Sequence, residues 1–386
     1  MRKICVITGT RAEFGLLSGL MQLIQQSENT TLQVVATNMH LSERYGNTYR
    51  EIEEAGFAID YKVPMLDESE ADDSTATIKA MSRALAGFAD AYDTLQPDLI
   101  VVLGDRFEIL CAVEAALVKQ IPAAHLHGGE LTYGAYDDAI RHSITKMSHL
   151  HFTSTEEYRS RVIQLGEQPE RVFNVGALGV ENIKRVPLMS IDEVERDLKF
   201  EIGDNTLLVT YHPVTLSNSN TLEDIQALFD ALDEHPELRV IFTMPNSDTG
   251  GQVIAETIEQ YAAQHTDRVR AYKSLGMRRY LSVMKYCASV VGNSSSGILE
   301  TPSFHIPTLN IGTRQDGRFA AESVYNCGTN KEAISAGLTH ILSPEFKTMA
   351  AKVANPYEKG GTAQAIFDVI STYPLEGIIK KEFYDL

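Results

Sequence analysis

Short apolar runs alternate with amphipathic stretches along the first half of the chain. Six runs rich in β-branched and other apolar residues are typical of strands: Lys3–Ile7, Leu32–Thr37, Leu99–Leu103, Ala123–Leu126, His151–Thr153 and Val172–Val175. Between them lie stretches with helical periodicity, among them Gly15–Gln26, Ser74–Leu95 and Phe107–Lys119. This alternation predicts βαβ units in a doubly wound parallel sheet.

A second series of the same kind follows. Its expected strands are Leu207–Tyr211, Arg239–Thr243, Ser289–Val291 and Thr308–Ile311. With 386 residues, the chain is also longer than a single hydrophobic core usually serves. We therefore predict two Rossmann-like domains of the α/β class, at 1–177 and 178–363, joined near Gly176–Gly179. The segment 364–386 is too short to be a domain, and we expect it to pack back on the first one.

Composition narrows the class of ligand. The net charge of −18 disfavours nucleic acid and anionic membrane surfaces as partners, so an anionic ligand would need locally concentrated arginines. No apolar stretch approaches the roughly 20 residues of a membrane helix. Four widely spaced cysteines indicate reduced thiols in the core. Because a strand rather than a secretory leader opens the sequence, we expect a cytoplasmic protein.

The ends of the first strands carry candidate chemistry, since ligands of open parallel sheets bind there. The first strand runs into Thr-Gly-Thr-Arg-Ala-Glu-Phe-Gly, where Arg11 offers charge beside a helix start. The pattern is not G-x-G-x-x-G, which disfavours a dinucleotide cofactor. An ordinary turn with a solvated Arg11 is equally compatible. The strand Leu99–Leu103 delivers Asp105 and Arg106, although Asp105 has the alternative of being only a helix N-cap.

Titratable residues gather in and after the next expected strand, Ala123–Leu126. They are His125, His127, Glu130, Asp137, Asp138, Arg141 and His142. If the strand stays extended, His125 and His127 share one of its faces. Such a gathering at neighbouring strand ends is what acid/base chemistry requires. The alternative, a metal site, is disfavoured because the spacing matches no zinc motif, and we predict no metal ion.

The second half offers polar groups that suit a phosphate. His212 ends one strand, and Asn246 lies in a loop after another. The most specific pattern is Gly-Asn-Ser-Ser-Ser-Gly-Ile-Leu-Glu, residues 292–300, which predicts an anion cradle at a helix start with Glu300 placed to accept hydrogen bonds from ribose. The alternative is a serine-capped helix. Arg314 follows the last strand, and the absence of a P-loop motif disfavours a nucleoside triphosphatase.

These pieces, in this order, resemble the UDP-N-acetylglucosamine 2-epimerase family, particularly its hydrolysing enzymes of sialic acid biosynthesis. The segments that carry the resemblance are TGTRAEFG, HLSERYGNTY, LGDRFE, HLHGGE, DDAIRHSITKMSHLHFTSTEEY, HPVT, MPNSDTG, GNSSSGILE and NIGTRQ. The resemblance implies a GT-B arrangement, two Rossmann-like domains with a central cleft. We expect no cofactor.

Roles follow from the resemblance position by position. The positions that match UDP-binding residues of the family are Arg11, Arg106, His212, Asn246, Ser294, Ser295, Glu300 and Arg314, with the serines on the diphosphate and Glu300 on the ribose. His40 matches a histidine that lines the sugar site, and Asp105 and Asp137 match catalytic carboxylates. Many members carry a catalytic glutamate where this chain has His127, so His127 or Glu130 is expected to do that proton work.

The activity that the resemblance implies is conversion of UDP-N-acetylglucosamine and water to N-acetylmannosamine and UDP, through anti elimination of UDP and hydration of the resulting glycal. His212 is expected to take part from the second domain. The alternatives are a sister enzyme for a UDP-2,4-diacetamido-2,4,6-trideoxyglucose of the legionaminic acid route, a GT-B glycosyltransferase, and a UDP-sugar sensor without catalysis. We also expect a homodimer or a homotetramer.

Overall fold

The computed structural model describes residues 1–70, 73–133, 136–214, 221–245 and 250–386. The chain divides into two compact units. Unit 1 consists of Met1–Glu130, Asp137–Asn182 and Lys359–Leu386, and unit 2 of Leu131–Tyr136 and Ile183–Glu358. The predicted domain boundaries at 177 and 363 lie a few residues from those of the units.

Unit 1 contains a seven-stranded sheet in the order β3-β2-β1-β4-β5-β6-β7, with every neighbouring pair parallel. Its strands are β1 (Arg2–Thr8), β2 (Thr30–Thr37), β3 (Tyr61–Val63), β4 (Leu99–Leu103), β5 (Ala123–Leu126), β6 (Leu150–Thr153) and β7 (Val172–Asn174). Its helices are α1 (Arg11–Gln26), α2 (Tyr49–Glu54), α3 (Ser74–Leu95), α4 (Phe107–Val118), α5 (Asp137–Met147), α6 (Glu156–Gln164) and α15 (Thr362–Thr372), with short 3-10 turns η1 (Asn38–Leu41) and η2 (Pro169–Arg171). Helix α7 (Leu178–Arg185) leads from unit 1 into unit 2.

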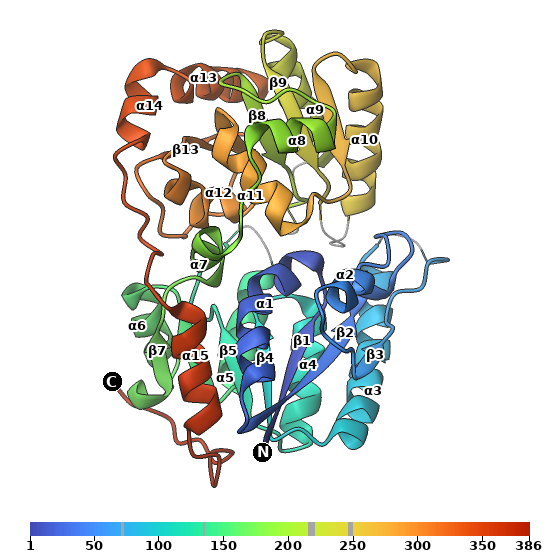
Figure 1. Ribbon diagram of the computed structural model, residues 1–386, viewed down its shortest axis with the longest axis vertical. Helices are drawn as coiled ribbons and strands as arrows, with labels where there is room; N and C mark the ends of the chain where they lie inside the picture. Colours follow the sequence, from blue (N-terminus) through green and yellow to red (C-terminus); the bar gives the residue numbers. More distant parts are fainter. Residues whose placement is uncertain (71–72, 134–135, 215–220, 246–249) are drawn as a thin grey trace. The chain divides into compact units, whose positions relative to one another are not determined.

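Helices cover both faces of this sheet (Figure 1). On one face, Leu17 and Leu20 of α1 join Ile366 of α15 in the core. On the other face, Phe88 of α3 and Ala112 of α4 belong to a second hydrophobic core. The strands are continuously apolar rather than alternating because both of their faces are buried.

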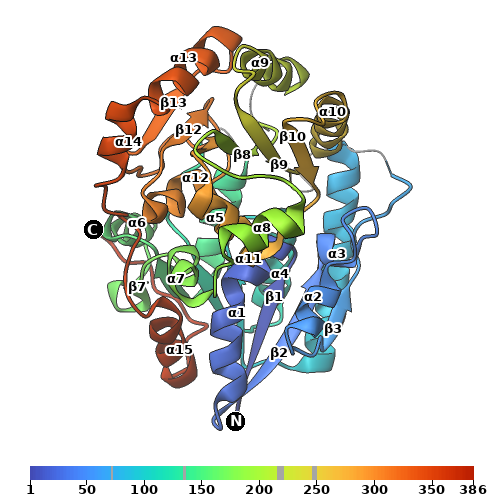
Figure 2. The ribbon, with the colours of Figure 1, turned by 45° about the horizontal axis from the view of Figure 1, so that its top comes forward.

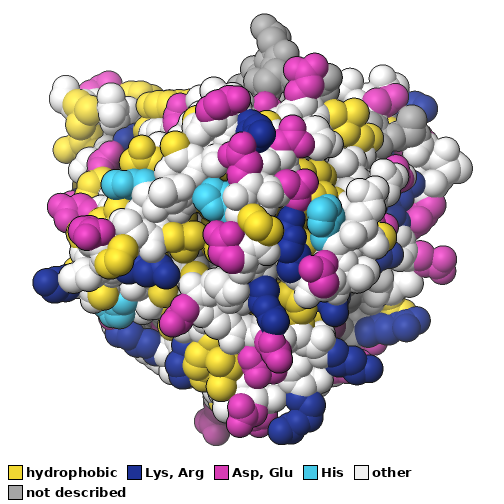
Figure 3. Space-filling view, turned by 90° about the horizontal axis from the view of Figure 1, so that it is seen from above, with side chains coloured by type: hydrophobic (Ala, Val, Ile, Leu, Met, Phe, Trp, Pro, Cys, Tyr) yellow, Lys and Arg dark blue, Asp and Glu magenta, His cyan; other side chains and the backbone are white. Residues whose placement is uncertain are grey.

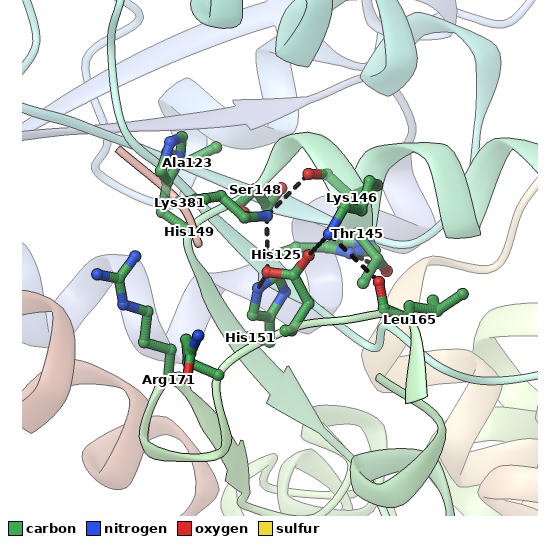
Figure 4. A network of polar contacts seen from close by, with 12 residues as sticks. Ala123, His125, Thr145, Lys146, Ser148, His149, His151, Leu165, Arg171 and Lys381 are labelled. Atoms are coloured by element: carbon green, nitrogen blue, oxygen red, sulfur yellow. Dashed lines mark hydrogen bonds and ion pairs between the residues drawn. The ribbon is translucent and has the colours of Figure 1, made fainter. Parts of the chain in front are cut away.

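The C-terminal segment belongs to unit 1. Helix α15 lies beside α1 (Figure 1, Figure 2), and the Thr362 hydroxyl donates to the Val175 carbonyl at 2.8 Å. Further on, Lys381 donates to the Ser148 carbonyl at 2.6 Å (Figure 4) and forms an ion pair with the buried Glu167. Burial opposes ionisation of Glu167, but its contacts with His151 and Lys381 outweigh burial and lower its pKa to about 2. The ion pair between Lys381 and the buried Glu167 therefore helps to hold the last residues of the chain against unit 1.

Unit 2 repeats the plan with six parallel strands in the order β10-β9-β8-β11-β12-β13. The strands are β8 (Thr206–Thr210), β9 (Arg239–Thr243), β10 (Val269–Tyr272), β11 (Ser289–Gly292), β12 (Thr308–Ile311) and β13 (Val324–Cys327). The helices are α8 (Ile191–Leu198), α9 (Thr221–Asp233), α10 (Gly251–Gln264), α11 (Gly276–Tyr286), α12 (Ser296–Leu299), α13 (Lys331–Ile341) and α14 (Pro344–Ala350), with the 3-10 turn η3 (Thr301–Phe304). In both sheets the strand order reverses beside the first strand, β1 or β8, which is where ligands of doubly wound sheets bind.

The predicted fold class, two Rossmann-like parallel-sheet domains, is confirmed. Strands β3, β10 and β13 were not predicted, because each is an edge strand of three or four residues that lacks a buried apolar run. Cys5, Cys111 and Cys287 are buried as expected, and Cys327 is half-buried.

Two surface properties bear on partners. Figure 3 shows acidic side chains spread over one face among basic and hydrophobic ones, without a single large patch. In the part of the chain that the structure describes, no helix is both long enough and apolar enough to cross a bilayer.

Candidate active site

The turn from β1 to α1 places Arg11 at the first residue of the helix, four residues before the expected start at Gly15. Thr10 caps the helix, because its hydroxyl accepts from the Glu13 amide at 3.2 Å while the Glu13 carboxylate accepts from the Thr10 amide at 3.3 Å and also from the Gly9 amide at 2.7 Å. This capping box fixes the helix start, and its Thr-x-x-Glu spacing is a sequence signal that the expected start at Gly15 overlooked. The Arg11 guanidinium forms an ion pair with Glu51 of α2 at 2.6 Å.

Two buried carboxyl groups lie beneath this turn. Glu108 of α4 accepts from Arg106 Nε at 2.8 Å, and a Cβ atom on Gly9 would lie 2.5 Å from Glu108 Oε1. Gly9 is therefore required for the close approach of Glu108, rather than for a special turn conformation. Burial, with the neighbouring Glu108 charge, raises the pKa of Glu13 to about 8.

His40 lies in η1 and is fully buried. Its Nε2 is 3.0 Å from the Thr8 hydroxyl, and its Nδ1 is 2.7 Å from the Thr48 hydroxyl. Burial lowers its pKa to about 4, so the ring is neutral. Both ring nitrogens thus have partners inside unit 1, and the sugar-lining role stays a prediction.

The end of β4 presents Asp105 and Arg106. Gly104 adopts a left-handed conformation, with φ of +81°, and its amide donates to the Leu126 carbonyl at 3.0 Å. Arg106, not Asp105, occupies the N-cap position of α4. The alternative interpretation of Asp105 as an N-cap is therefore wrong, and its carboxylate instead forms an ion pair with Arg141 of α5.

His127 and Glu130 contact each other just beyond β5. The shared strand face expected for His125 and His127 is wrong, because β5 ends at Leu126 and His127 is left-handed with φ of +64°. A non-glycine residue in this region costs on the order of 1 kcal/mol or more, which the surrounding contacts must offset. His127 Nε2 accepts from the Leu178 amide at 3.4 Å, so Nδ1 carries the proton and faces Glu130 Oε1 at 3.3 Å.

Arg141 connects these groups and was missing from the predicted site residues. It is the largest fully buried side chain in the described chain. Its guanidinium contacts the Asp105 carboxylate, the Glu130 carbonyl at 2.8 Å and Asp138 at 3.1 Å. A buried guanidinium needs such pairing. The available signal was its position one turn after Asp137, which is itself buried at the start of α5.

In unit 2, His212 follows β8 and is fixed to the end of β11. The Asn293 side chain accepts from the His212 amide at 2.6 Å and donates to the His212 carbonyl at 2.8 Å. Gly292 allows β11 to lie this close to the end of β8, since a Cβ atom on Gly292 would lie 2.0 Å from the Thr210 carbonyl oxygen. The backbone of His212 is thereby held rigidly at the strand ends.

The serine-rich loop lies beside the same strand ends. Ser294 and Ser295 are partly exposed, and Ser295 makes no capping hydrogen bond. The helix expected after them, α12, has only four residues before η3, so its dipole is weak. Arg314, after β12, donates to the Asn293 carbonyl at 3.2 Å. Glu300 follows α12 and is partly exposed.

The structure thus forms two sets of candidate residues. Unit 1 contributes Arg11, His40, Asp105, Arg106, His127, Glu130 and Asp137, and unit 2 contributes His212, Ser294, Ser295, Glu300 and Arg314. Asn246 lies outside the described residues. No group of three or more residues with metal-ligating side chains is found among those described.

Two doubly wound units, with acid/base groups on one and hydroxyl, amide and guanidinium groups on the other, are typical of Rossmann-like enzymes that bind nucleotides. The family model described as UDP-N-acetylglucosamine 2-epimerase matches residues 22–371. The chain belongs to this family of UDP-sugar 2-epimerases, and the resemblance drawn from the sequence motifs is confirmed at that level.

Three relatives align over nearly their whole length. A GDP/UDP-N,N'-diacetylbacillosamine 2-epimerase (hydrolyzing) from Campylobacter jejuni is 41% identical, covering 100% of this chain and 99% of its own. The polysialic acid biosynthesis protein P7 from Escherichia coli is 36% identical, covering 100% and 98%. A UDP-N,N'-diacetylbacillosamine 2-epimerase (hydrolyzing) from Legionella pneumophila is 36% identical, covering 98% of each chain. These relatives do not single out the sialic acid type.

The fold is shared with solved structures. The crystal structure of UDP-GlcNAc 2-epimerase from Neisseria meningitidis bound to UDP-GlcNAc has a TM-score of 0.78 at 19% identity, covering 95% of this chain and 99% of its own. This agreement extends over both parallel sheets and supports the GT-B fold class.

Proposed function

We propose that this chain is a hydrolysing 2-epimerase whose substrate is a UDP-linked 2,4-diacetamido-2,4,6-trideoxyglucose, the sugar also called N,N'-diacetylbacillosamine. The observation that carries the proposal is the 41% identity, over the whole chain, to a relative named for that sugar, with a second such relative at 36%. The alternative drawn from the sequence is thereby favoured over UDP-N-acetylglucosamine and N-acetylmannosamine.

The proposed reaction has two steps that balance. First, a base removes the proton at C2 and the C1–O bond to UDP breaks, which gives a glycal and UDP. Then the oxygen of water bonds to C1 and a proton bonds to C2 from the opposite face. The released products are the 2-epimeric free sugar and UDP. These steps require two proton-transfer groups near C2 and stabilisation of the departing diphosphate.

The groups of unit 1 suit the proton transfers. In the proposal His127 is the first proton-transfer group. Its Nδ1 lies 3.3 Å from Glu130 Oε1, and its Nε2, which accepts from the Leu178 amide at 3.4 Å in this structure, has to leave that amide to take the C2 proton. A carboxylate that orients an imidazole in this way is a recurring arrangement for a general base. Asp105, whose carboxylate is oriented by its ion pair with Arg141, is the second proton-transfer group of the proposal. Asp137, the first residue of α5, is a further candidate for this role.

The groups of unit 2 suit the nucleotide. In this proposal Arg314 and the hydroxyls of Ser294 and Ser295 bind the diphosphate, His212 hydrogen-bonds a phosphate oxygen and Glu300 accepts from ribose hydroxyls. Support comes from their common position at the ends of β8, β11 and β12, where the rigid Asn293 contacts keep the backbone in place. Arg11 and Arg106 of unit 1 are proposed to add positive charge for the phosphates.

The test is a substrate comparison. The purified protein is incubated with UDP-N,N'-diacetylbacillosamine, its GDP-linked counterpart or UDP-N-acetylglucosamine, and the released sugar is identified by NMR. We expect UDP release from the first substrate with a kcat/KM at least about tenfold above the other two, a ratio worth about 1.4 kcal/mol. The Asp105→Asn variant is the matched control for enzymatic turnover.

Two results would overturn the proposal. A higher kcat/KM for UDP-N-acetylglucosamine would return the assignment to that sugar. Retention of the nucleotide–sugar bond in all three substrates would remove the hydrolytic reaction itself.

A further inference from the structure

His125 of β5 is a fully buried histidine outside the groups assigned to the reaction. Its Nε2 lies 2.7 Å from the Gly104 carbonyl oxygen, and its Nδ1 lies 3.1 Å from the Thr145 hydroxyl. A carbonyl oxygen only accepts hydrogen bonds, so Nε2 must carry the proton and Nδ1 must accept from Thr145. Burial lowers the pKa of His125 to about 3, which keeps this neutral tautomer. Figure 4 shows His125 and Thr145 within the buried polar network of unit 1.

The contact with Gly104 acts on the backbone that presents Asp105. The Gly104 carbonyl and the Asp105 amide belong to one peptide plane, and this plane begins directly after the left-handed Gly104. The Gly104 amide is held as well, because it donates to the Leu126 carbonyl at 3.0 Å. Strand β5 therefore holds both polar groups of Gly104, one through its backbone and the other through the His125 ring.

Helix α5 holds the other end of Asp105. Arg141 forms an ion pair with the Asp105 carboxylate, and Thr145, one turn further along the same helix, bonds to His125. Helix α5 therefore supports Asp105 in two ways. Arg141 binds its carboxylate, and Thr145 bonds to the His125 ring that contacts the Gly104 carbonyl. Since Arg141 also donates to the Glu130 carbonyl, the same helix relates Asp105 to Glu130.

The turn that carries His127 and Glu130 rests on the same pair of side chains. A Cβ atom on Gly128 would lie 3.0 Å from Thr145 Oγ1 and 3.1 Å from His125 Nδ1. The turn is therefore in close contact with the His125–Thr145 pair. The His125–Thr145 pair therefore lies against both the Gly104 peptide and this turn.

We propose that His125 is a positioning residue for the epimerase reaction: by donating to the Gly104 carbonyl, it sets the peptide plane that directs Asp105 toward the reacting sugar. The proposal deepens the proposed function and rests on it. His125 itself touches neither substrate nor reacting atoms, and its effect on turnover passes through Asp105.

Two substitutions separate the two ring nitrogens. The amide nitrogen of His125→Gln reaches the position of Nε2 and keeps a donor for Gly104, whereas the shorter His125→Asn reaches only the position of Nδ1, near Thr145. We expect kcat to fall by about ten- to a hundredfold in His125→Asn, since displacing a catalytic group by about 1 Å costs up to that much. In His125→Gln we expect most of kcat to return. The Kd of UDP, measured by calorimetry, should stay within about twofold in both variants.

A purely structural role would give a different pattern. Equal losses of kcat in the two variants, or a kcat of His125→Asn within about twofold of the wild type, would overturn the proposal. Thermal unfolding of each variant is measured alongside, so that a loss of folded protein is not read as a loss of kcat.

A second measurement does not depend on the substrate. The ¹⁵N NMR signals of the His125 ring report its tautomer in the ligand-free protein, assigned by their loss in His125→Gln. We expect protonated Nε2 and unprotonated Nδ1 between about pH 5 and pH 8. A proton on Nδ1 would overturn the inference even in an active enzyme. If the wild-type protein turned over none of the sugars while the expected tautomer was found, the proposed function would fail and the hydrogen bond would stand.

Discussion

Replacing Glu13 by glutamine should remove a pH dependence of stability that the wild-type protein carries between about pH 5 and pH 8. Glu13 is 5% exposed, and its Oε1, like Oε2 of Glu108, makes no hydrogen bond within the described part of the chain. Burial and the Glu108 charge raise the pKa of Glu13 to about 8, although Arg106 and the amides of Gly9 and Thr10 act in the opposite direction. A carboxyl group with a pKa of about 8 keeps its proton at neutral pH, so Glu13 is uncharged there.

The sign follows from proton linkage. An unfolded glutamate ionises near pH 4.5, so between that value and about 8 the folded state binds one proton more than the unfolded state. Stability from this group is complete below the unfolded pKa and is lost as pH rises, by about 1.4 kcal/mol per pH unit. Between pH 5 and pH 8 the change is on the order of 4 kcal/mol. Glutamine keeps the shape and cannot ionise, so the variant lacks this slope.

The assay must report on unit 1, because a two-domain chain does not have to unfold in one step. Hydrogen–deuterium exchange of peptides from β1, whose residues Ile4–Ile7 are completely buried, measures the free energy of opening that sheet. Wild type and Glu13→Gln are compared at several pH values, with the exposed Glu157→Gln as the control substitution. Parallel curves for wild type and Glu13→Gln would refute the raised pKa of Glu13, since all other titrating groups are common to both.

Three further predictions concern the site and one concerns acid stability. Arg314→Ala should weaken UDP binding about tenfold or more by calorimetry with an unchanged circular dichroism spectrum, because a charge-assisted phosphate bond is worth about 1.5–3 kcal/mol; unchanged affinity would exclude Arg314 from the nucleotide site. Asp105→Asn should abolish turnover and retain UDP binding, and near-normal rates would remove Asp105 from the proton transfers. In D2O the released sugar should carry deuterium at C2, and His127→Ala should lower turnover and deuterium incorporation together by about two to four orders of magnitude; a product without deuterium would rule out elimination. His40 and His149, whose pKa values burial lowers to about 4, stay neutral when folded and bind protons when unfolded. In the Glu13→Gln background, which lacks the opposing Glu13 slope, the free energy of unfolding measured by circular dichroism should therefore decrease as pH falls below about 6.5. Constant stability between pH 7 and pH 5 would contradict this.

Much of the candidate site could be predicted because local chemistry and strand ends coincide. Parallel strands share the edge at which they end, so residues after several strands meet without any knowledge of packing. Asp105 and Arg106 after β4 and Arg314 after β12 were found in this way. Arg141 was noted among the titratable residues but given no role, because its importance comes from burial against Asp105, which lies far from it in the sequence.

The sequence by itself determined the two parallel sheets, the helices between their strands and the placement of polar residues at strand ends. The reason is that strands buried on both faces must be continuously apolar, a pattern that is visible locally. Only the tertiary structure decided the left-handed backbone of His127, the need for Gly9 beneath Glu108 and the support that His125 gives to Gly104. Each of these depends on the close approach of groups from different elements. Such contacts are set by packing and hydrogen bonding across the sheet, which no local pattern of residues encodes.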